Sequence, residues 1–137
     1  MHMSHTYAIQ LAALLAFLGM GTAIPRLLSA HHGTSVSYDS QGEWSAEVIV
    51  RSFDFINPHP TMTFDVIDEL GRAEHWVAEL NTNPARMLRA GWTKAETLKV
   101  MQPGNRVVVS VRPARTGSNA GLVVEIRTLE GREVAQR

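Results

Sequence analysis

The residues best suited to chemistry are two histidines, His31 and His32, which directly follow an apolar N-terminal segment ending in Leu28-Ser29-Ala30. If a signal peptidase cuts after Ala30, His31 becomes the mature N-terminus, and its amine lies beside its own imidazole. Amine and imidazole nitrogens are good ligands for copper, zinc and nickel, so this terminus would chelate a transition metal. A cut after Ser29 would instead place His32 third, where its imidazole completes a square-planar site with the amine and two backbone amides.

His59 is the best candidate for a further nitrogen ligand. It stands between Pro58 and Pro60, which stiffen the backbone of a predicted loop and present the ring from it. Together with His31, and with His32 as a further option, His59 would form a three-nitrogen site that suits copper(II). The alternative is that these histidines are solvated residues of a polar arm and a turn, with weak metal affinity or none.

Other polar residues are expected at the surface. His75 is predicted on the polar face of a strand, two pleats from Glu79. Four acidic residues surround a predicted turn: Asp65, Asp68, Glu69 and Glu74. They lack the spacing of a calcium loop, so we expect them to be solvated. Three basic residues are candidates for a small anion-binding patch near a later loop: Arg112, Arg115 and Arg127.

An apolar segment, residues 7–24, precedes the histidines. Its richest part has the length of a signal-peptide hydrophobic region, whereas about 20 strongly apolar residues for a membrane span are only marginally available. We therefore expect residues 1–30 to be a signal peptide and the mature protein to be periplasmic. No Lys or Arg precedes the segment, and a cut after Ala23 also fits. An uncleaved helix that anchors the domain in the inner membrane is the alternative.

The mature chain from His31 would be one small domain with a single core. It loses only Arg26 among the charged residues, so 12 basic residues face 13 acidic ones and the net charge is −1. This balance does not favour nucleic-acid binding. Cysteine is absent from the chain, which excludes disulfides and thiolate chemistry. Stability must come from packing, a metal or a partner.

Apolar alternation predicts five strands after an extended polar arm over residues 31–42. The first begins at Trp44 and has a bulge before Phe53; the others cover residues 61–68, 74–80, 105–112 and 121–128. A helix begins after the N-cap Asn83 and ends before Gly91, and the capping box of residues 93–96 opens a further short turn. The tail, residues 129–137, is a candidate for a final hairpin arm.

Five strands with one short helix between the third and fourth predict an all-β, OB-like barrel over residues 43–137. In that fold the loops after the first and fourth strands flank the usual binding face. Here these loops are residues 57–60 and 113–120. The three tryptophans are expected to fill the barrel and its helical cap: Trp44, Trp76 and Trp92.

A series of short motifs runs along the mature chain: Ala30-His31-His32, Tyr38-Asp39, Asn57-Pro58-His59, Trp76 with Glu79, Asn83-Pro84 to Gly91-Trp92, Pro103-Gly104, and Pro113-Ala114-Arg115 with Gly117-Ser118. In this combination the chain resembles a family of small exported bacterial proteins that is catalogued as a domain of unknown function. The resemblance implies a periplasmic OB-like barrel and brings no established catalytic residues. The leader departs from the family pattern over residues 24–28, which bears on the cleavage site.

Two classes of function follow. The first is a periplasmic metal-binding module, in which His31 chelates copper and His59 completes the site. The second is a non-enzymatic accessory subunit, whose OB-like face or N-terminal arm docks on a larger exported or membrane complex. The chain has no nucleophile elbow and no phosphate-binding glycine loop, and no general acid or base stands beside the metal ligands. We therefore expect that it is not an enzyme.

Overall fold

The computed structural model describes residues 37–135, and the account below concerns this part of the chain. Its strands and helices follow one another in this order: β1 (Trp44–Asp54), β2 (Thr61–Ile67), β3 (Ala73–Leu80), α3 (Pro84–Arg89), α4 (Lys94–Val100), β4 (Arg106–Pro113), β5 (Ala120–Arg127) and β6 (Glu133–Ala135). Each predicted strand is present within two residues of its expected bounds.

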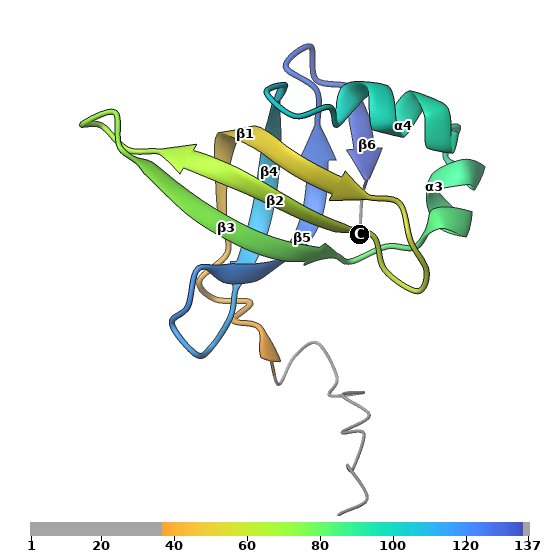
Figure 1. Cartoon of the computed structure of the whole chain (residues 1–137). Coiled ribbons are helices and arrows are strands. Elements are labelled where there is room, and N and C mark those ends of the chain that lie inside the picture. Colours follow the sequence, from red (N-terminus) through yellow and green to blue (C-terminus); the bar gives the residue numbers. More distant parts are fainter. Residues whose placement is uncertain (1–36, 136–137) are drawn as a thin grey trace, which may run out of the picture. The chain divides into compact units, whose positions relative to one another are not determined.

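The strands form a closed barrel (Figure 1). Their order in the sheet is β3-β2-β1-β4-β5-β6, and β3 also pairs with β5 in parallel, which closes β1 to β5 on themselves. The other neighbouring strands are antiparallel. Closure removes most of the edges that an open sheet would expose. The predicted small, five-stranded, OB-like barrel is confirmed, and β6 is the hairpin arm expected in the tail.

β1 is long enough to belong to both halves of the barrel. Its first part pairs with β4 as far as Ile49, and from Ile49 onward it pairs with β2. The register with β2 shifts between Val50 and Ser52, which is the predicted bulge. Because the extra residue reverses the alternation, both Val50 and Phe53 are buried on the inside. The bulge therefore bends the strand around the core.

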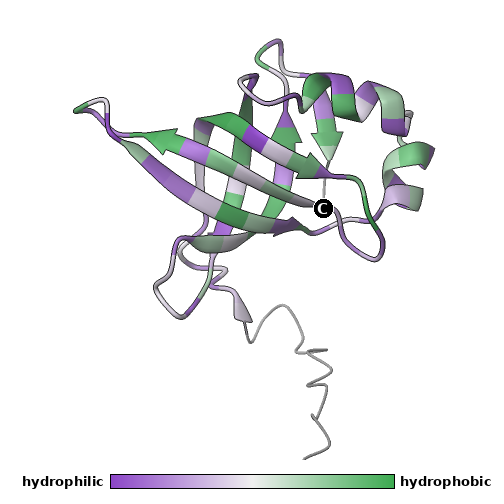
Figure 2. Ribbon diagram, viewed as in Figure 1, coloured by the Kyte–Doolittle hydropathy of each residue, from purple (hydrophilic) through white to green (hydrophobic). Residues whose placement is uncertain are grey.

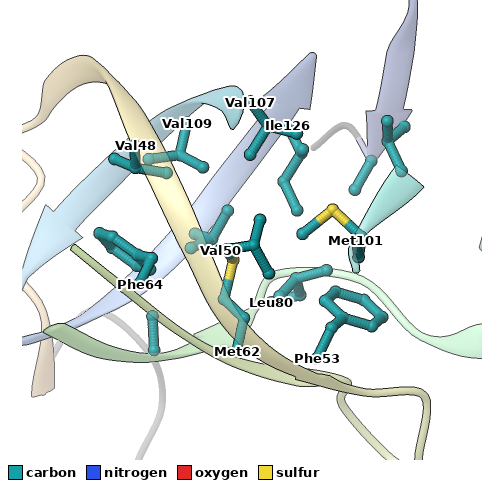
Figure 3. Close-up of a cluster of buried hydrophobic side chains, with 14 of the residues drawn as sticks. Val48, Val50, Phe53, Met62, Phe64, Leu80, Met101, Val107, Val109 and Ile126 are labelled. Atoms are coloured by element: carbon teal, nitrogen blue, oxygen red, sulfur yellow. The ribbon is translucent and has the colours of Figure 1, made fainter. Parts of the chain in front are cut away.

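Apolar side chains from all five barrel strands fill the interior (Figure 3). The alternation along the strands that places them there is visible in Figure 2. Phe64 and Leu80 are fully buried at the centre, and Met101 enters from the helical end. Burying one such side chain adds about 1.5–3 kcal/mol to the free energy of unfolding, relative to leaving it exposed. In a chain without cysteine, this packing is the main source of stability within the described residues.

Two short helices, rather than the single one predicted, cover the end of the barrel beside β6 (Figure 1). α3 begins as expected, with the Asn83 side chain accepting a hydrogen bond from the Arg86 amide. The predicted turn after it is α4, because the capping box of Thr93 and Glu96 satisfies the first amides and Thr97 is buried. No helix in residues 37–135 is long and apolar enough to cross a membrane.

Candidate functional site

Only one of the three predicted metal ligands can be placed. His31 and His32 lie outside the described residues, whereas His59 lies in the loop between β1 and β2. Across residues 37–135, no group of three or more His, Cys, Asp or Glu side chains is arranged to hold a metal ion. A metal bound by His59 would therefore need further ligands from outside this range.

His59 is oriented by main-chain carbonyls that follow β3. Its Nδ1 lies 3.1 Å from the carbonyl oxygen of Leu80 and 2.9 Å from that of Thr82. Both partners are acceptors, so Nδ1 carries a proton and donates it. In the neutral ring Nε2 then bears the lone pair, and the residue is exposed. Metal-binding histidines are held in the same way, with one ring nitrogen bonded to a carbonyl and the other to the metal.

The same loop is also tied to β3 through its backbone. The Leu80 amide donates to the Pro60 carbonyl at 2.8 Å. His59 is thus fixed on both sides, through its ring and through the residue that follows it. This geometry agrees with the prediction that a stiff loop presents the His59 ring. That His59 binds a metal stays a prediction.

The described part of the N-terminal arm docks on the end of β4. Tyr38 bridges to Ala114, and the Asp39 amide donates to the Pro113 carbonyl at 2.9 Å. The Tyr38 hydroxyl donates to Glu79 on β3 at 2.8 Å. Burial, with the Glu79 carboxylate beside it, raises the pKa of Tyr38 to about 12. The arm is therefore anchored at the loop between β4 and β5, one of the two loops that flank the expected binding face.

The outer face of β1, β2 and β3 carries a three-residue ionic cluster that the sequence did not reveal. Asp65 is fully buried, and its two carboxylate oxygens contact Arg51 and His75, whose side chains are largely exposed. The Arg51 guanidinium, and then the hydrogen bond from His75, hold the pKa of Asp65 below its usual value against the effect of burial. An open depression beside the cluster is lined by Arg51, Thr63, His75, Trp76 and Val77.

This cluster corrects the prediction for Asp65, which is buried and not part of a solvated acidic turn. His75 lies exposed on the polar face of β3, as predicted, and there it contacts Asp65. The reason is the register of the hairpin, which places Asp65 directly opposite His75. A turn over residues 69–72, as predicted, would have set Asp65 opposite Trp76. The turn that forms is one residue shorter: the Asp68 amide donates to the Arg72 carbonyl, so these two residues pair and residues 69–71 alone make the turn.

The predicted basic patch does not form. Arg112 pairs with Glu43 at 3.0 Å, and Arg115 lies 4.0 Å from Asp39. Arg127 pairs with Glu125 at the far end of β5, away from the loop. Since each guanidinium has a carboxylate neighbour, the loop between β4 and β5 offers no concentrated positive charge.

The tryptophans fill the barrel and its cap, as predicted. Trp44 and Trp76 pack edge to face with ring centroids 5.0 Å apart and lie against the core. Trp92 is buried between the helices and the C-terminal hairpin, where its Nε1 donates to the Glu133 carbonyl at 2.6 Å. Their main contribution is therefore to packing.

Comparison with known protein families gives a match over most of the chain. The model of a family described as "Family of unknown function (DUF6152)" matches residues 22–125. No curated protein and no solved structure matches the chain. The match covers the barrel strands from β1 through most of β5, together with His31, His32 and His59.

Proposed function

Since the chain belongs to DUF6152, a family of unknown function, we propose its function from its own residues: it is an exported, periplasmic protein that binds copper. In this proposal, signal peptidase cuts after Ala30, and His31 chelates the metal through its amine and imidazole. His59 supplies a third nitrogen. His32 takes part instead if the cut falls after Ser29.

The orientation of His59 is the observation that carries the proposal. Its Nδ1 is occupied by the carbonyls of Leu80 and Thr82, so the nitrogen left to coordinate is Nε2 on an exposed ring. Because the loop is fixed before a metal arrives, binding would not require the loop to be ordered at that moment. Copper(II) favours nitrogen ligands of this kind in a planar or T-shaped arrangement.

Binding or delivery of copper, rather than catalysis, fits these residues best. The contacts of the His59 ring within residues 37–135 are to main-chain carbonyls, which neither accept nor release protons at neutral pH. A delivery protein needs an accessible metal and a stable scaffold, and the closed barrel provides the second.

Copper titration of the mature protein tests this function. The intact mass of protein from its native compartment first establishes the N-terminus, which we expect at His31. His59→Asn is the sharpest variant, because its side-chain amide can still donate to the Leu80 and Thr82 carbonyls while Nε2 is lost. We expect His59→Asn and His59→Ala to weaken copper binding about tenfold or more. His75→Asn is the matched control and leaves the affinity unchanged.

Two results would reject the proposal. One is a mature chain that begins well upstream of His31, since the amine chelate would then not exist. The other is equal copper affinity in the native chain and in His59→Asn. A thermal-unfolding scan of each variant separates loss of the ligand from loss of the fold.

A second function, as a non-enzymatic accessory subunit, is favoured by the outer face of β1 to β3. Val77 is 59% exposed there, beside the depression formed by Arg51 and His75. A photo-crosslinking residue at position 77 in the native host should capture a specific exported or membrane protein. The same residue at position 129, another exposed apolar position, is the control. Identical products from both positions would reject this role.

A further inference from the structure

A pocket of about 380 Å³ lies between α3 and the C-terminal strand β6 (Figure 1). Small-molecule sites in proteins have volumes of about 300–1,000 Å³, so this pocket is large enough for a small organic ligand. Met87 of α3 and Val134 of β6 give it apolar walls, and Thr82, which precedes α3, lines it as well. The side chain of Ala90, at the end of α3, is too small to fill the space.

Two arginines without an acidic partner stand at this pocket. Arg86 and Arg89 are three residues apart on α3, which places them on the same face of the helix. Within residues 37–135, neither forms an ion pair with a carboxylate. The other described arginines are engaged: Arg132 lies over the Trp92 ring, and six have a carboxylate neighbour, namely Arg51, Arg72, Arg106, Arg112, Arg115 and Arg127. The uncompensated guanidinium charge is therefore gathered at this one pocket of the described fold.

One acidic side chain, Glu133, also lines the pocket. Its carboxylate lies 4.0 Å from Arg127, which is not among the lining residues. Against Arg86 and Arg89 it leaves the lining with a net charge of +1. Because a guanidinium remains protonated throughout the physiological pH range, this positive charge does not depend on pH.

Thr82 supplies a buried polar group without a partner. The residue is 6% exposed, and its hydroxyl forms no hydrogen bond with another residue of the described chain. The contact with His59 uses the Thr82 carbonyl instead. Buried hydroxyl groups in proteins normally have a hydrogen-bond partner. The Thr82 hydroxyl is therefore left to donate to an oxygen atom of a molecule in the pocket.

We propose that the pocket between α3 and β6 binds a small organic oxyanion, a carboxylate or phosphate group attached to an apolar body. Arg86 and Arg89 donate to the charged oxygens, as guanidinium groups do in bidentate pairs with such anions. The Thr82 hydroxyl donates to the same group, and the apolar body packs on Met87 and Val134. The inference goes beyond both proposed functions and depends on neither of them.

Nuclear magnetic resonance of the metal-free, isotope-labelled protein, as processed by its host, tests the inference. The probes are benzoate and phenyl phosphate, and the matched neutral control is benzamide. We expect both anions to shift the amide signals of Ala90, Val134 and Ala135, and benzamide to bind about tenfold more weakly than benzoate. The relative affinities of the two anions then assign the group to the carboxylates or to the phosphates.

Variants of the polar lining separate a built site from general charge attraction. The double variant Arg86→Gln/Arg89→Gln should bind benzoate about tenfold more weakly. Thr82→Val removes the hydroxyl at nearly constant shape and should weaken binding about threefold or more. Lys99→Gln is the matched control, because it removes a positive charge from a different depression, and it should bind benzoate like the native chain.

Ala90→Leu keeps both guanidinium groups but fills the pocket, so we expect benzoate binding to be lost. A thermal-unfolding scan confirms that each variant is folded. Equal binding of benzamide and benzoate would overturn the inference, and so would native affinity in the double variant or in Ala90→Leu. His59→Asn should bind benzoate like the native chain, so this test and the copper titration fail or succeed separately.

Discussion

At the scale of single residues, two histidines are oriented through Nδ1 by different partners. His59 donates to main-chain carbonyls, and His75 contacts the buried carboxylate of Asp65. The flanking prolines made His59 a candidate from the sequence, but its carbonyl partners lie more than 20 residues away and could not be predicted. Asp65 was assigned to a solvated turn, because its pairing with His75 depends on a hairpin register that the turn length decides.

Asp65 predicts a specific sensitivity to acid. Arg51, and then His75, lower its pKa in the folded state, so the unfolded state binds a proton more readily. The stabilisation is fully present above the unfolded pKa of about 3.9 and is lost as the pH falls through the folded pKa. We expect the urea midpoint to drop as the pH is lowered from about 5, with a shallower slope in Asp65→Asn. At neutral pH the free energy of unfolding of Asp65→Asn should be about 1 kcal/mol lower than that of the native chain.

Glu47→Gln is the control for Asp65, because it removes an ion pair with Arg106 in which both side chains are substantially exposed. Glu47→Gln should change the free energy of unfolding by no more than about 0.5 kcal/mol. If Asp65→Asn shows the same pH slope as the native chain, the cluster does not stabilise the fold in the way described.

Tyr38 allows a direct optical test of the docked arm. The chain has two tyrosines, and the other, Tyr7, leaves with the signal peptide if residues 1–30 are removed. The phenolate absorbance of the mature protein should therefore titrate at a pKa of about 12, the value set by burial and Glu79. Glu79→Gln should lower that midpoint. A native midpoint near the ordinary value of about 10 would show that the arm is not held on β3.

At the scale of elements, alternation and helix caps predicted most strands and the start of α3. The bulge in β1 was visible as a break in that alternation before Phe53. The register of β2 with β3 was not, because it depends on whether the connecting turn has four residues or three. Gly71, at a φ of +76°, allows the shorter turn, which the pairing of Asp68 with Arg72 closes. A one-residue difference in the turn was enough to hide the contact between Asp65 and His75.

Gly121 predicts how closely β4 and β5 must approach. A Cβ at this position would lie 2.5 Å from Cγ1 of Val111 and 2.9 Å from the carbonyl oxygen of Arg112. Gly121→Ala should therefore destabilise the barrel by about 1–3 kcal/mol, measured by urea unfolding. Ala120→Ser, at the adjacent and less buried position, should change the stability by less than about 0.5 kcal/mol. A Gly121→Ala protein as stable as the native one would mean that the two strands are further apart.

At the scale of the whole molecule, the order of strands and helices was sufficient to predict the closed barrel. The pairing of β3 with β5 follows from that order, since it is the closure that hides most strand edges. The docking of Tyr38 on Glu79 and Ala114 could not be predicted, because it joins segments that no local pattern connects.

The central claim is that His59 coordinates copper together with the mature N-terminus. Electron paramagnetic resonance of the copper(II)-loaded mature protein tests it most directly, because nitrogen hyperfine structure reports the ligands themselves. We predict three coordinated nitrogens in the native chain and two in His59→Asn, while His75→Asn keeps the native spectrum. An unchanged spectrum in His59→Asn, with the variant still folded, would contradict the claim.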